Sequence, residues 1–484
     1  MHLLSYLLWT PVIGALLVVL VPPTRRRLAR GLALGHAGLT LALAILALTR
    51  FSTGTAAIQL AERLVWNEAV GVSYALGVDG LSMPMVLLTA ALGLFALLSH
   101  DEGGSRGYHA WMLLLEAAIL GVFLSRDWTL FYMFWEGSLI PLFFLINQWG
   151  GPRRHEAGLN FVLYTMFGSA FLITAFAVLF LLTPGRSFDM AVMATGGRGL
   201  PAATQALLFV AFLIGFGVKF PMFPLHGWMP LTHSEAPPPV IVLLSAIKMG
   251  AYGLIRVVGT LPEGALRAQS VMLALALVGM VYGGLLAWRQ RDLRLMVAYS
   301  IISHSALILL GISACNEMGL FGAALQMVAH GLIAGSLFLL VGALTRRTGS
   351  RDVSDLGGLP RVTPWLSILA ALAFLASLGL PGGVGFVAEF HTLLGALQRW
   401  RWGVAGAALG VVISAGYALR TIGRLLFGPT PDRLRGLSDL HPMELVAALP
   451  LAIATVALGL LPAPLIAMMA ASARALAAPF GGGR

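Results

Sequence analysis

Apolar segments about as long as a bilayer is thick recur along almost the whole chain, and this feature constrains the fold more than any other. A transmembrane helix needs ~20 predominantly apolar residues, and only short stretches rich in glycine, proline and arginine separate these segments. With 58% hydrophobic and 11% charged residues, the 484-residue chain lies outside the composition of soluble globular domains. We therefore predict an all-α polytopic membrane protein without a sizeable soluble domain.

The apolar pattern predicts about fourteen transmembrane helices. Their approximate limits are 3–22, 31–49, 76–99, 110–125, 128–147, 159–182, 205–228, 239–258, 269–287, 293–313, 317–344, 364–394, 403–427 and 443–471. The first has no basic residue before it and no small-residue cleavage site after it, so we interpret it as a retained helix and not as a signal peptide. The single cysteine, Cys315, excludes an internal disulfide and a cysteine-ligated cluster in this chain. Redox chemistry is therefore expected elsewhere.

The formal net charge of +11 indicates membrane orientation and not a nucleic-acid partner. The arginines are scattered singly through the loops and span ends, with 18 of the 29 on one side of the predicted bundle and 11 on the other. Because loops on the cytoplasmic side carry the excess of basic residues, we predict that both termini lie on the outer side of the cell inner (plasma) membrane.

Only two of the 31 basic residues are lysines, and both Lys219 and Lys248 fall inside predicted spans. Arginine stays protonated in proteins, whereas a desolvated lysine loses its proton readily. The pattern therefore indicates two switchable cations. The structural alternative is a lysine that snorkels to the interface or a static counter-ion between helices, although Lys248 lies too deep within its span for easy snorkelling.

Lys219 precedes Pro221, Pro224 and Pro230. Each proline removes a backbone donor and clashes with the carbonyl four residues earlier, so this span should be a broken helix with freed carbonyls beside Lys219. Broken helices at membrane depth line cavities or are buried in protein, and they mark ion sites in transporters. We therefore predict an ion-handling site at this break.

Three glutamates, Glu116, Glu136 and Glu389, lie within apolar spans, where a carboxylate is unfavourable without a partner or a role. Glu136 is the candidate partner of Lys219, because an adjacent carboxylate favours the ammonium form. Glu116 is either a supporting residue or an inert carboxyl held protonated. Glu389 follows Pro381 and several glycines, so a second broken helix is expected just before it.

Two histidines are further candidates for a proton relay. His304 is flanked by Ser303 and Ser305, whose hydroxyls can hold water or pass protons, although a lone buried histidine is more often a hydrogen-bonded structural residue. His330 has the same two interpretations. His226, His233 and His391 lie near span ends, where we expect them at the interface.

The two broken spans recur at nearly one period along the chain. Lys219 and Glu389 are 170 residues apart, and Glu136 and His304 are 168 residues apart. Matched broken spans indicate internal transporter repeats. We predict four units: helices 1–3 (1–109), a first five-helix repeat (110–258), a second repeat inverted relative to it (269–427) and a C-terminal helix with a tail (443–484).

The stretches 219–237 and 245–256 resemble the antiporter-like membrane subunits of respiratory complex I, which are similar to Mrp-type sodium/proton antiporters. The resemblance extends from about residue 70 to residue 430. It implies that Glu136 and Lys219 match the family's glutamate–lysine pair, Lys248 its central lysine, and His304 with His330 its polar positions in helices 10 and 11.

Glu389 further resembles the glutamate of the M-type subunit, where the L and N types usually carry lysine. The chain also stops soon after the last predicted span, without a long lateral helix like that of the L type. The resemblance implies a proton-translocating subunit of an NADH:quinone oxidoreductase. It would have neighbouring L and N subunits, no cofactor of its own, and FMN and iron–sulfur clusters in partner subunits.

Two other classes of function, an antiporter and a structural scaffold, are weighed against this one, and the electron donor of the complex is left open. An autonomous sodium/proton antiporter would transport without NADH, and subunits of hydrogenase- or ferredoxin-linked relatives carry the same kind of chain. A purely structural membrane scaffold leaves the confinement of both lysines, Lys219 and Lys248, to the bilayer unexplained.

Overall fold

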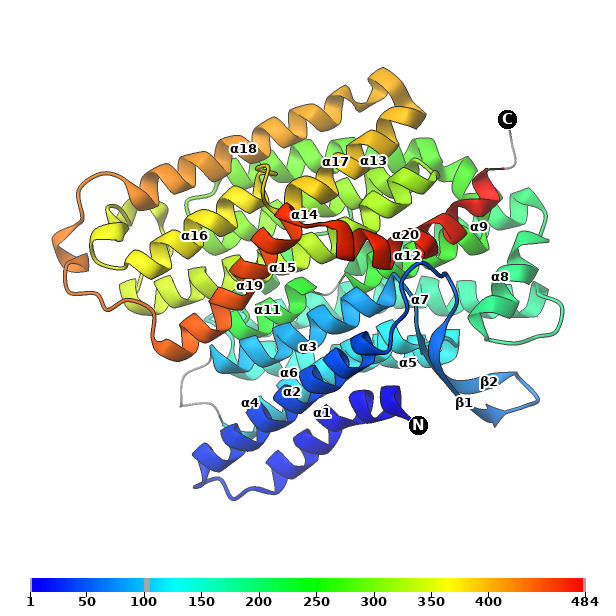
Figure 1. The fold of residues 1–484 in the computed structure, drawn as a ribbon, viewed down its shortest axis with the longest axis horizontal. Helices are drawn as coiled ribbons and strands as arrows, with labels where there is room; N and C mark the ends of the chain where they lie inside the picture. Colours follow the sequence, from blue (N-terminus) through cyan, green and yellow to red (C-terminus); the bar gives the residue numbers. More distant parts are fainter. Residues whose placement is uncertain (1, 100–104, 247, 482–484) are drawn as a thin grey trace.

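The computed structural model describes residues 2–99, 105–246 and 248–481. Among them, thirteen helical segments are long and apolar enough to cross a membrane, and two shorter apolar helices, Ser82–Leu98 and Pro364–Ser377, accompany them. The chain folds into one bundle of long, roughly aligned helices (Figure 1). The predicted fold class, an all-α polytopic membrane protein, is confirmed.

The helices follow one another with short connections. The first half of the chain contains α1 (Leu3–Leu20), α2 (Arg26–Thr49), α3 (Ser82–Leu98), α4 (Arg106–Leu124), α5 (Trp128–Gly137), α6 (Leu139–Trp149), α7 (Arg154–Leu182), α8 (Met190–Arg198), α9 (Ala202–Lys219), α10 (Met229–Glu235), α11 (Pro238–Ala246) and α12 (Met249–Thr260). The second half contains α13 (Pro262–Arg289), α14 (Leu293–Ser313), α15 (Glu317–Thr348), α16 (Pro364–Ser377), α17 (Val384–Trp400), α18 (Ala405–Leu426), α19 (Pro442–Leu460) and α20 (Ala463–Ala477). Short 3-10 helices cover Val353–Asp355, Leu359–Arg361, Arg401–Val404, Asp432–Leu434 and Ala478–Phe480.

Several acidic loop residues begin the helices that follow them. Asp127, Asp189 and Asp292 each accept hydrogen bonds from two backbone N–H groups at the start of α5, α8 and α14, and Asn316 accepts one from Gly319 at the start of α15. The first N–H groups of a helix have no partner within the helix, and such caps satisfy them. These four polar side chains therefore define where spans start.

Both predicted broken spans are broken in the structure. α9 ends at Lys219 and α10 begins at Met229, with Pro221 and Pro224 in between. In the second half, six residues that include Pro381 separate the end of α16 from the start of α17. The missing proline donors explain both interruptions.

The structure also corrects some predicted spans. The predicted span 443–471 is two helices, α19 and α20, which meet at Leu461 and Pro462. The predicted span 76–99 starts too early, because residues up to Val78 belong to a strand. The span 128–147 is interrupted at Ser138, and the span 239–258 is interrupted between α11 and α12, where Ile247 lies outside the described residues.

A β-hairpin that the sequence analysis did not predict precedes α3. Its strands, β1 (Gln59–Asn67) and β2 (Val72–Val78), pair in antiparallel register, with Leu64 opposite Tyr74. The segment was overlooked because a strand of seven to nine residues gives a much weaker apolar signal than a span. The short helix α8 was overlooked for the same reason.

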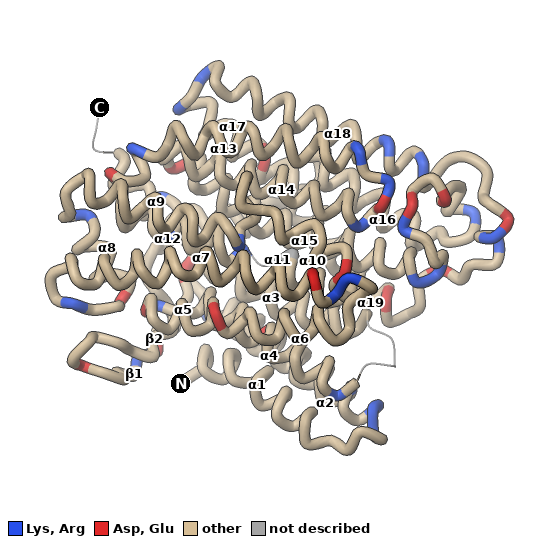
Figure 2. The backbone as a smooth tube through the Cα atoms, turned by 180° about the vertical axis from the view of Figure 1, so that it is seen from behind, with Lys and Arg blue, Asp and Glu red and all other residues tan. Residues whose placement is uncertain are grey.

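Both termini lie at the end of the bundle that also carries the hairpin and α8 (Figure 1). This arrangement requires an even number of crossings, as the sequence analysis predicted with fourteen. Charged residues gather at the two ends of the bundle and are sparse between them (Figure 2). This distribution matches a bilayer-embedded middle, because charged side chains are costly in lipid. Which end faces the cytoplasm stays a prediction.

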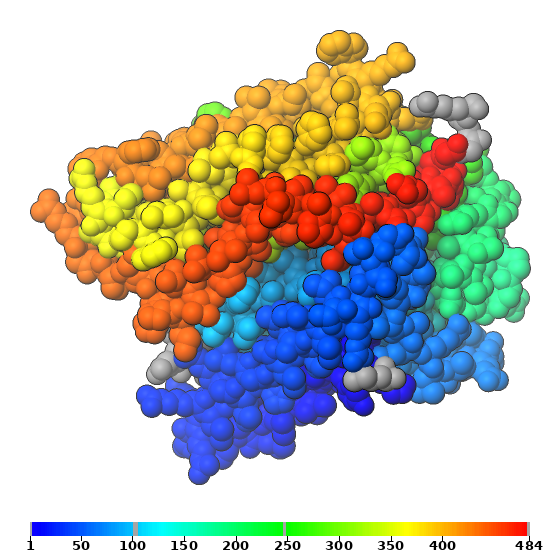
Figure 3. Space-filling view, in the orientation of Figure 1, coloured from blue at the N-terminus to red at the C-terminus, as the bar shows by residue number. Residues whose placement is uncertain are grey.

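α15 lies at the centre of the bundle, and its most apolar window is fully buried. It contacts α3, α11, α14, α16, α17, α19 and α20. In contrast, α1 and α2 form one edge of the molecule and α18 another, while α19 and α20 cross the face between them (Figure 3). The edge helices expose large apolar side chains such as Leu16, Leu39 and Val412, as lipid-facing helices do.

Candidate functional site

Lys219 is the last residue of α9, at the first break, and its side chain is buried. Its Nζ donates hydrogen bonds to the backbone carbonyl of Trp135 (2.9 Å) and to Ser138 Oγ (2.6 Å), and it lies 4.4 Å from the centre of the Trp135 ring. The interruption between α5 and α6 at Ser138 supplies two of these contacts. The ammonium is thus held by polar groups without a formal charge.

Glu136 lies between these contact residues but points elsewhere. Within the described part of the chain no ion pair of 4.0 Å or less joins Glu136 to Lys219, and Glu136 Oε1 is buried without a hydrogen-bond partner. The expected adjacent pair is therefore not in direct contact. The reason is helical geometry: successive side chains point about 100° apart, so Trp135 and Ser138 share a face that Glu136 does not.

Lys248 caps the start of α12 and is buried at the interruption that follows α11. Its helix packs closely on the helix that carries Lys219: a Cβ added to Gly250 would lie 2.6 Å from the carbonyl oxygen of Phe216 in α9. α12 also contacts α14 and α15, the helices that carry His304 and His330. Lys248 therefore stands between the first break and the histidines.

The second break brings three more predicted residues together. His304 is in the middle of α14, His330 in α15 and Glu389 in the first turns of α17, and all three are buried. His304 Nδ1 lies 3.8 Å from Glu389 Oε1, and the two imidazole rings have centroids 5.1 Å apart. His304 Nε2 and His330 Nδ1 have no hydrogen-bond partner among the described residues. The two histidines therefore each keep one ring nitrogen without a partner among these residues.

Gly379 lies directly against the Glu389 carboxyl. It has a φ of +75°, a conformation that L-residues with a side chain rarely adopt. A Cβ at this position would lie 2.1 Å from Glu389 Oε2. The backbone of the break therefore approaches the carboxyl directly, and only a glycine leaves room for it.

Glu116 has a similar glycine neighbour but no ionisable contact. It is fully buried in α4, and neither carboxyl oxygen has a hydrogen-bond partner within the described chain. A Cβ on Gly93 of α3 would lie 2.6 Å from its carboxyl carbon. The structure does not join Glu116 to the other candidates.

His233 and His226 were expected at the interface, but both are buried in the structure. His233 lies on the short helix α10, and its Nδ1 is 3.0 Å from the Met229 carbonyl oxygen. The prediction from their position near span ends was wrong, because the chain after the proline-rich break, including α10, is buried against other helices of the bundle. His391 is partly exposed.

A buried charged cluster at the hairpin end was not foreseen. Asp79 lies between β2 and α3 and accepts hydrogen bonds from Arg256 Nη1 (2.5 Å) and Nη2 (2.7 Å). Arg126 Nη1 lies 3.4 Å from the same carboxylate, and Arg126 also donates to the Gly77 carbonyl and to Ser82 Oγ. The cluster ties the hairpin to α12. A single sequence offers no signal for it, because the three charges lie far apart along the chain.

A resident metal centre is not indicated in the part of the chain that the structure describes, where no three His, Cys, Asp or Glu residues are grouped to hold an ion. The candidate site is instead a set of separate ionisable side chains along the interior.

Comparison with known proteins identifies the family to which this architecture belongs. Residues 125–414 match the family model described as NADH:quinone oxidoreductase/Mrp antiporter, TM. The chain belongs to this family. Subunit M of the F(420)H(2) dehydrogenase of Methanosarcina mazei is 34% identical over 98% of this chain and 97% of its own length. NAD(P)H-quinone oxidoreductase chain 4 1 of Synechococcus sp. (strain JA-3-3Ab) is 38% identical over 95% of this chain and 90% of its own length.

Among solved structures, a chain of respiratory complex I from Thermus thermophilus has the same fold. Its TM-score is 0.92 at 31% identity, and the alignment covers 99% of this chain and 100% of that chain. The resemblance to the antiporter-like complex I subunits, and to their M type in particular, is therefore confirmed. This family member is a membrane subunit of a multisubunit complex that contains other antiporter-like subunits.

Proposed function

We propose that this chain is the M-type proton-translocating subunit of an NADH:quinone oxidoreductase. Quinone reduction in partner subunits drives it, and it has no redox centre of its own. The observation that carries the proposal is a series of buried ionisable side chains across the interior: Lys219 at the first break, Lys248, His330, His304, and Glu389 at the second break. Such groups are costly in a membrane protein unless they serve an ion pathway.

Lys219 fits the role of a proton store. Its ammonium bonds to a carbonyl and a hydroxyl and not to a carboxylate, so no fixed ion pair locks its proton in place. In this proposal Glu136, next to Trp135 in α5, biases Lys219 from a distance when it is ionised. A change in charge around Glu136 or Lys248 would then shift Lys219 between its two protonation states.

The second half of the path ends at His304 and Glu389. Their 3.8 Å separation exceeds the 2.6–3.2 Å of a direct proton-transfer contact. A small rotamer movement or one water molecule bridges this difference, so the pair is suited to gated transfer. We assign Lys248 and His330 to the link between Lys219 and this pair, and Glu116 to a supporting role beside the first half.

The matched breaks support two inverted five-helix repeats, 110–258 and 269–427, between the N-terminal unit 1–109 and the C-terminal unit 443–484. In this proposal each repeat contributes one broken helix to the path, as in repeat-built transporters. We also propose location in the bacterial plasma membrane with both termini outside, L- and N-type neighbours, and FMN and iron–sulfur clusters in partner subunits.

The test is purification of the complex through a tag on this chain. The proposal expects copurified flavin and iron–sulfur subunits. It also expects NADH-dependent quinone reduction to move protons across the membrane of sealed vesicles. The family description also names Mrp antiporters, so a sodium/proton exchanger is the alternative. A purified assembly that exchanges sodium for protons, contains no flavin and shows no NADH-dependent activity would overturn the proposal in favour of that alternative.

A further inference from the structure

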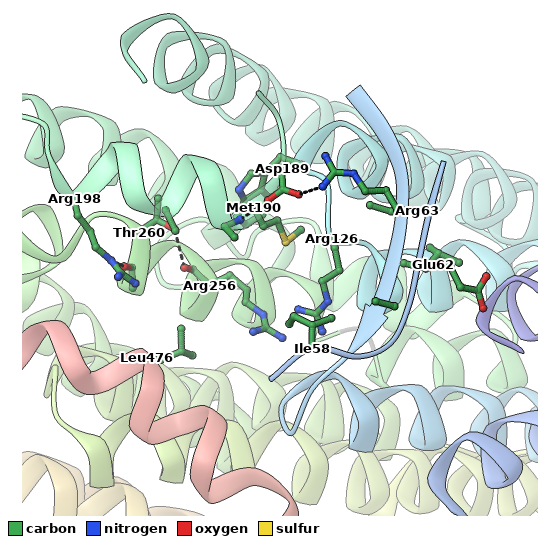
Figure 4. Close-up of a pocket in the computed structure, with 17 residues that line it drawn as sticks. Ile58, Glu62, Arg63, Arg126, Asp189, Met190, Arg198, Arg256, Thr260 and Leu476 are labelled. Atoms are coloured by element: carbon green, nitrogen blue, oxygen red, sulfur yellow. Dashed lines mark hydrogen bonds and ion pairs between the residues drawn. The ribbon is translucent and has the colours of Figure 1, made fainter. Parts of the chain in front are cut away.

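A cavity of about 320 Å3 opens at the hairpin end of the bundle, away from the proton path. The hairpin, the loop before α5, and helices α8, α12 and α20 enclose it (Figure 4). Its volume lies at the lower end of the usual range for ligand pockets, ~300–1,000 Å3. The walls are mainly apolar, but guanidinium groups enter from four elements.

The charges that line this cavity do not balance. Four arginines contribute: Arg63, Arg126, Arg198 and Arg256. On the acidic side, Asp189 pairs with Arg63 at 3.2 Å and Asp79 pairs with Arg126 and Arg256. Four arginines against two aspartates leave a net charge of +2, and among the described residues Arg198 has no acidic partner. Since arginine stays protonated, this excess is permanent.

Glu62 also borders the cavity, but its carboxylate is turned away from it. The carboxylate accepts hydrogen bonds from the backbone N–H of Leu4 (2.7 Å) and from Ser5 Oγ (2.5 Å) of α1. Figure 4 shows Glu62 on the far side of the strands from Arg198 and Arg256. It does not reduce the positive charge facing the cavity.

Two arginines retain unused donors. Arg198 donates from Nε to the carbonyl of Gly259 (2.8 Å), and within the described chain no hydrogen bond is found for its two Nη atoms. Arg256 Nε is buried without a hydrogen-bond partner among the same residues. Arg198 is exposed, so its Nη atoms are open to an incoming anion, whereas the buried Arg256 donor without an acceptor is unfavourable. An anion in the cavity would accept from both arginines.

An apolar groove of about 610 Å3 runs along the other side of α8. Its walls include Leu182, Pro184, Val192 and Leu200, and it shares Ala191 with the arginine-lined cavity. On α9, the helix that follows α8, Leu207 is 74% exposed, as expected of a side chain facing lipid tails. A cationic pocket and an apolar groove thus meet at the start of α8.

We propose that this pair of sites binds one acidic phospholipid, with its phosphate against Arg198 and Arg256 and an acyl chain in the groove between α7 and α8. Basic pockets between membrane helices bind anionic headgroups through charge-assisted hydrogen bonds. A free phosphate would use the same arginines but would leave the groove empty. The groove is therefore the reason to assign a lipid.

The test uses the assembled complex in phosphatidylcholine nanodiscs that contain phosphatidylglycerol with a photoactivatable acyl chain. Cross-linked peptides are identified by mass spectrometry. We expect labelling within residues 182–200, and about tenfold less labelling in Arg198→Gln, because a hydrogen bond to a charged group is lost. Val192→Trp should reduce the labelling similarly by filling the groove without changing the charge.

Arg433→Gln is the control, because Arg433 is likewise an exposed arginine that donates to a backbone carbonyl (Asp355, 2.8 Å) but lies outside the cavity. Arg433 also pairs with the Asp355 carboxylate at 3.4 Å. The Arg433→Gln variant should label like the wild type. Equal labelling in Arg198→Gln and the wild type would overturn the proposal. So would equal labelling by the phosphatidylcholine analogue. No labelling of residues 182–200 by the phosphatidylglycerol analogue, together with binding of inorganic phosphate to the wild type and not to Arg198→Gln, would assign the cavity to free phosphate and reject the lipid.

Discussion

Gly379→Ala tests whether the second break positions the Glu389 carboxyl for proton transfer. The new Cβ would lie 2.1 Å from Glu389 Oε2, whereas ordinary van der Waals contact begins at 3.4 Å. The carboxyl must therefore move by about 1.3 Å, which is a third of its present 3.8 Å separation from His304. A misplacement of ~1 Å can reduce a reaction about 10²-fold. We expect pumping to fall between about tenfold and a hundredfold.

The alanine also strains the backbone, because residue 379 has φ +75°. A non-glycine residue in the left-handed region costs about 1–2 kcal/mol. Gly382→Ala is the matched control: its φ is +101°, it lies in the same break, and the nearest side-chain atom, from Leu460, is 3.8 Å away. This control isolates backbone strain from collision with the carboxyl.

The assay is proton uptake by sealed vesicles with NADH, corrected for the amount of this subunit. Gly379→Ala should pump far less than Gly382→Ala at equal assembly. Shortening the acid in Gly379→Ala/Glu389→Asp should restore part of the pumping, because it relieves the collision. Equal pumping in the two alanine variants would refute the reasoning.

Four further predictions follow from the same contacts. Lys219→Arg keeps the charge but cannot release its proton, so pumping should fall on the order of 10²-fold; pumping near the wild type in assembled vesicles would leave Lys219 as a static counter-ion. Glu136→Gln should lower NADH-coupled activity more than Glu136→Asp does, since Gln removes the long-range charge; indistinguishable activities near the wild type would exclude Glu136. Glu389→Ala should suppress pumping in an assembled complex, while Glu389→Lys should be milder if only a titratable group is needed; full pumping by the alanine variant would remove Glu389 from the path. Asp79→Asn leaves Arg126 and Arg256 without their carboxylate and should destabilise the subunit by about 3–5 kcal/mol, measured as a lower thermal unfolding temperature in detergent; an unchanged temperature would show that the cluster does not hold the hairpin end together.

Local physical rules along the chain were enough to predict the fold class and the two main breaks. A lipid environment requires long apolar helices whatever their neighbours are, and proline interrupts a helix through its own ring and missing donor. The same desolvation argument singled out Lys219, Lys248 and Glu389 before any contact was known, because an ionisable group within an apolar span needs a reason to be there.

Contacts between distant segments depended on the tertiary structure. Helix rotation about its axis decides that Lys219 meets Trp135 and Ser138 while Glu136 faces elsewhere. The fold alone brings Gly379 against Glu389, since a tolerance of a few tenths of an ångström is not encoded in hydrophobic periodicity.

The hairpin end of the bundle shows most clearly which properties follow from the sequence and which depend on tertiary packing. By itself the sequence determined that the chain crosses the bilayer and which ionisable residues lie within its apolar spans, because these properties follow from the cost of each residue in lipid. Only the tertiary structure decided which charges meet: Asp79 and Arg256 are 177 residues apart, and packing of the hairpin against α12 brings them within hydrogen-bonding distance. Long-range contacts of this kind depend on the relative placement of whole helices, which no local pattern specifies.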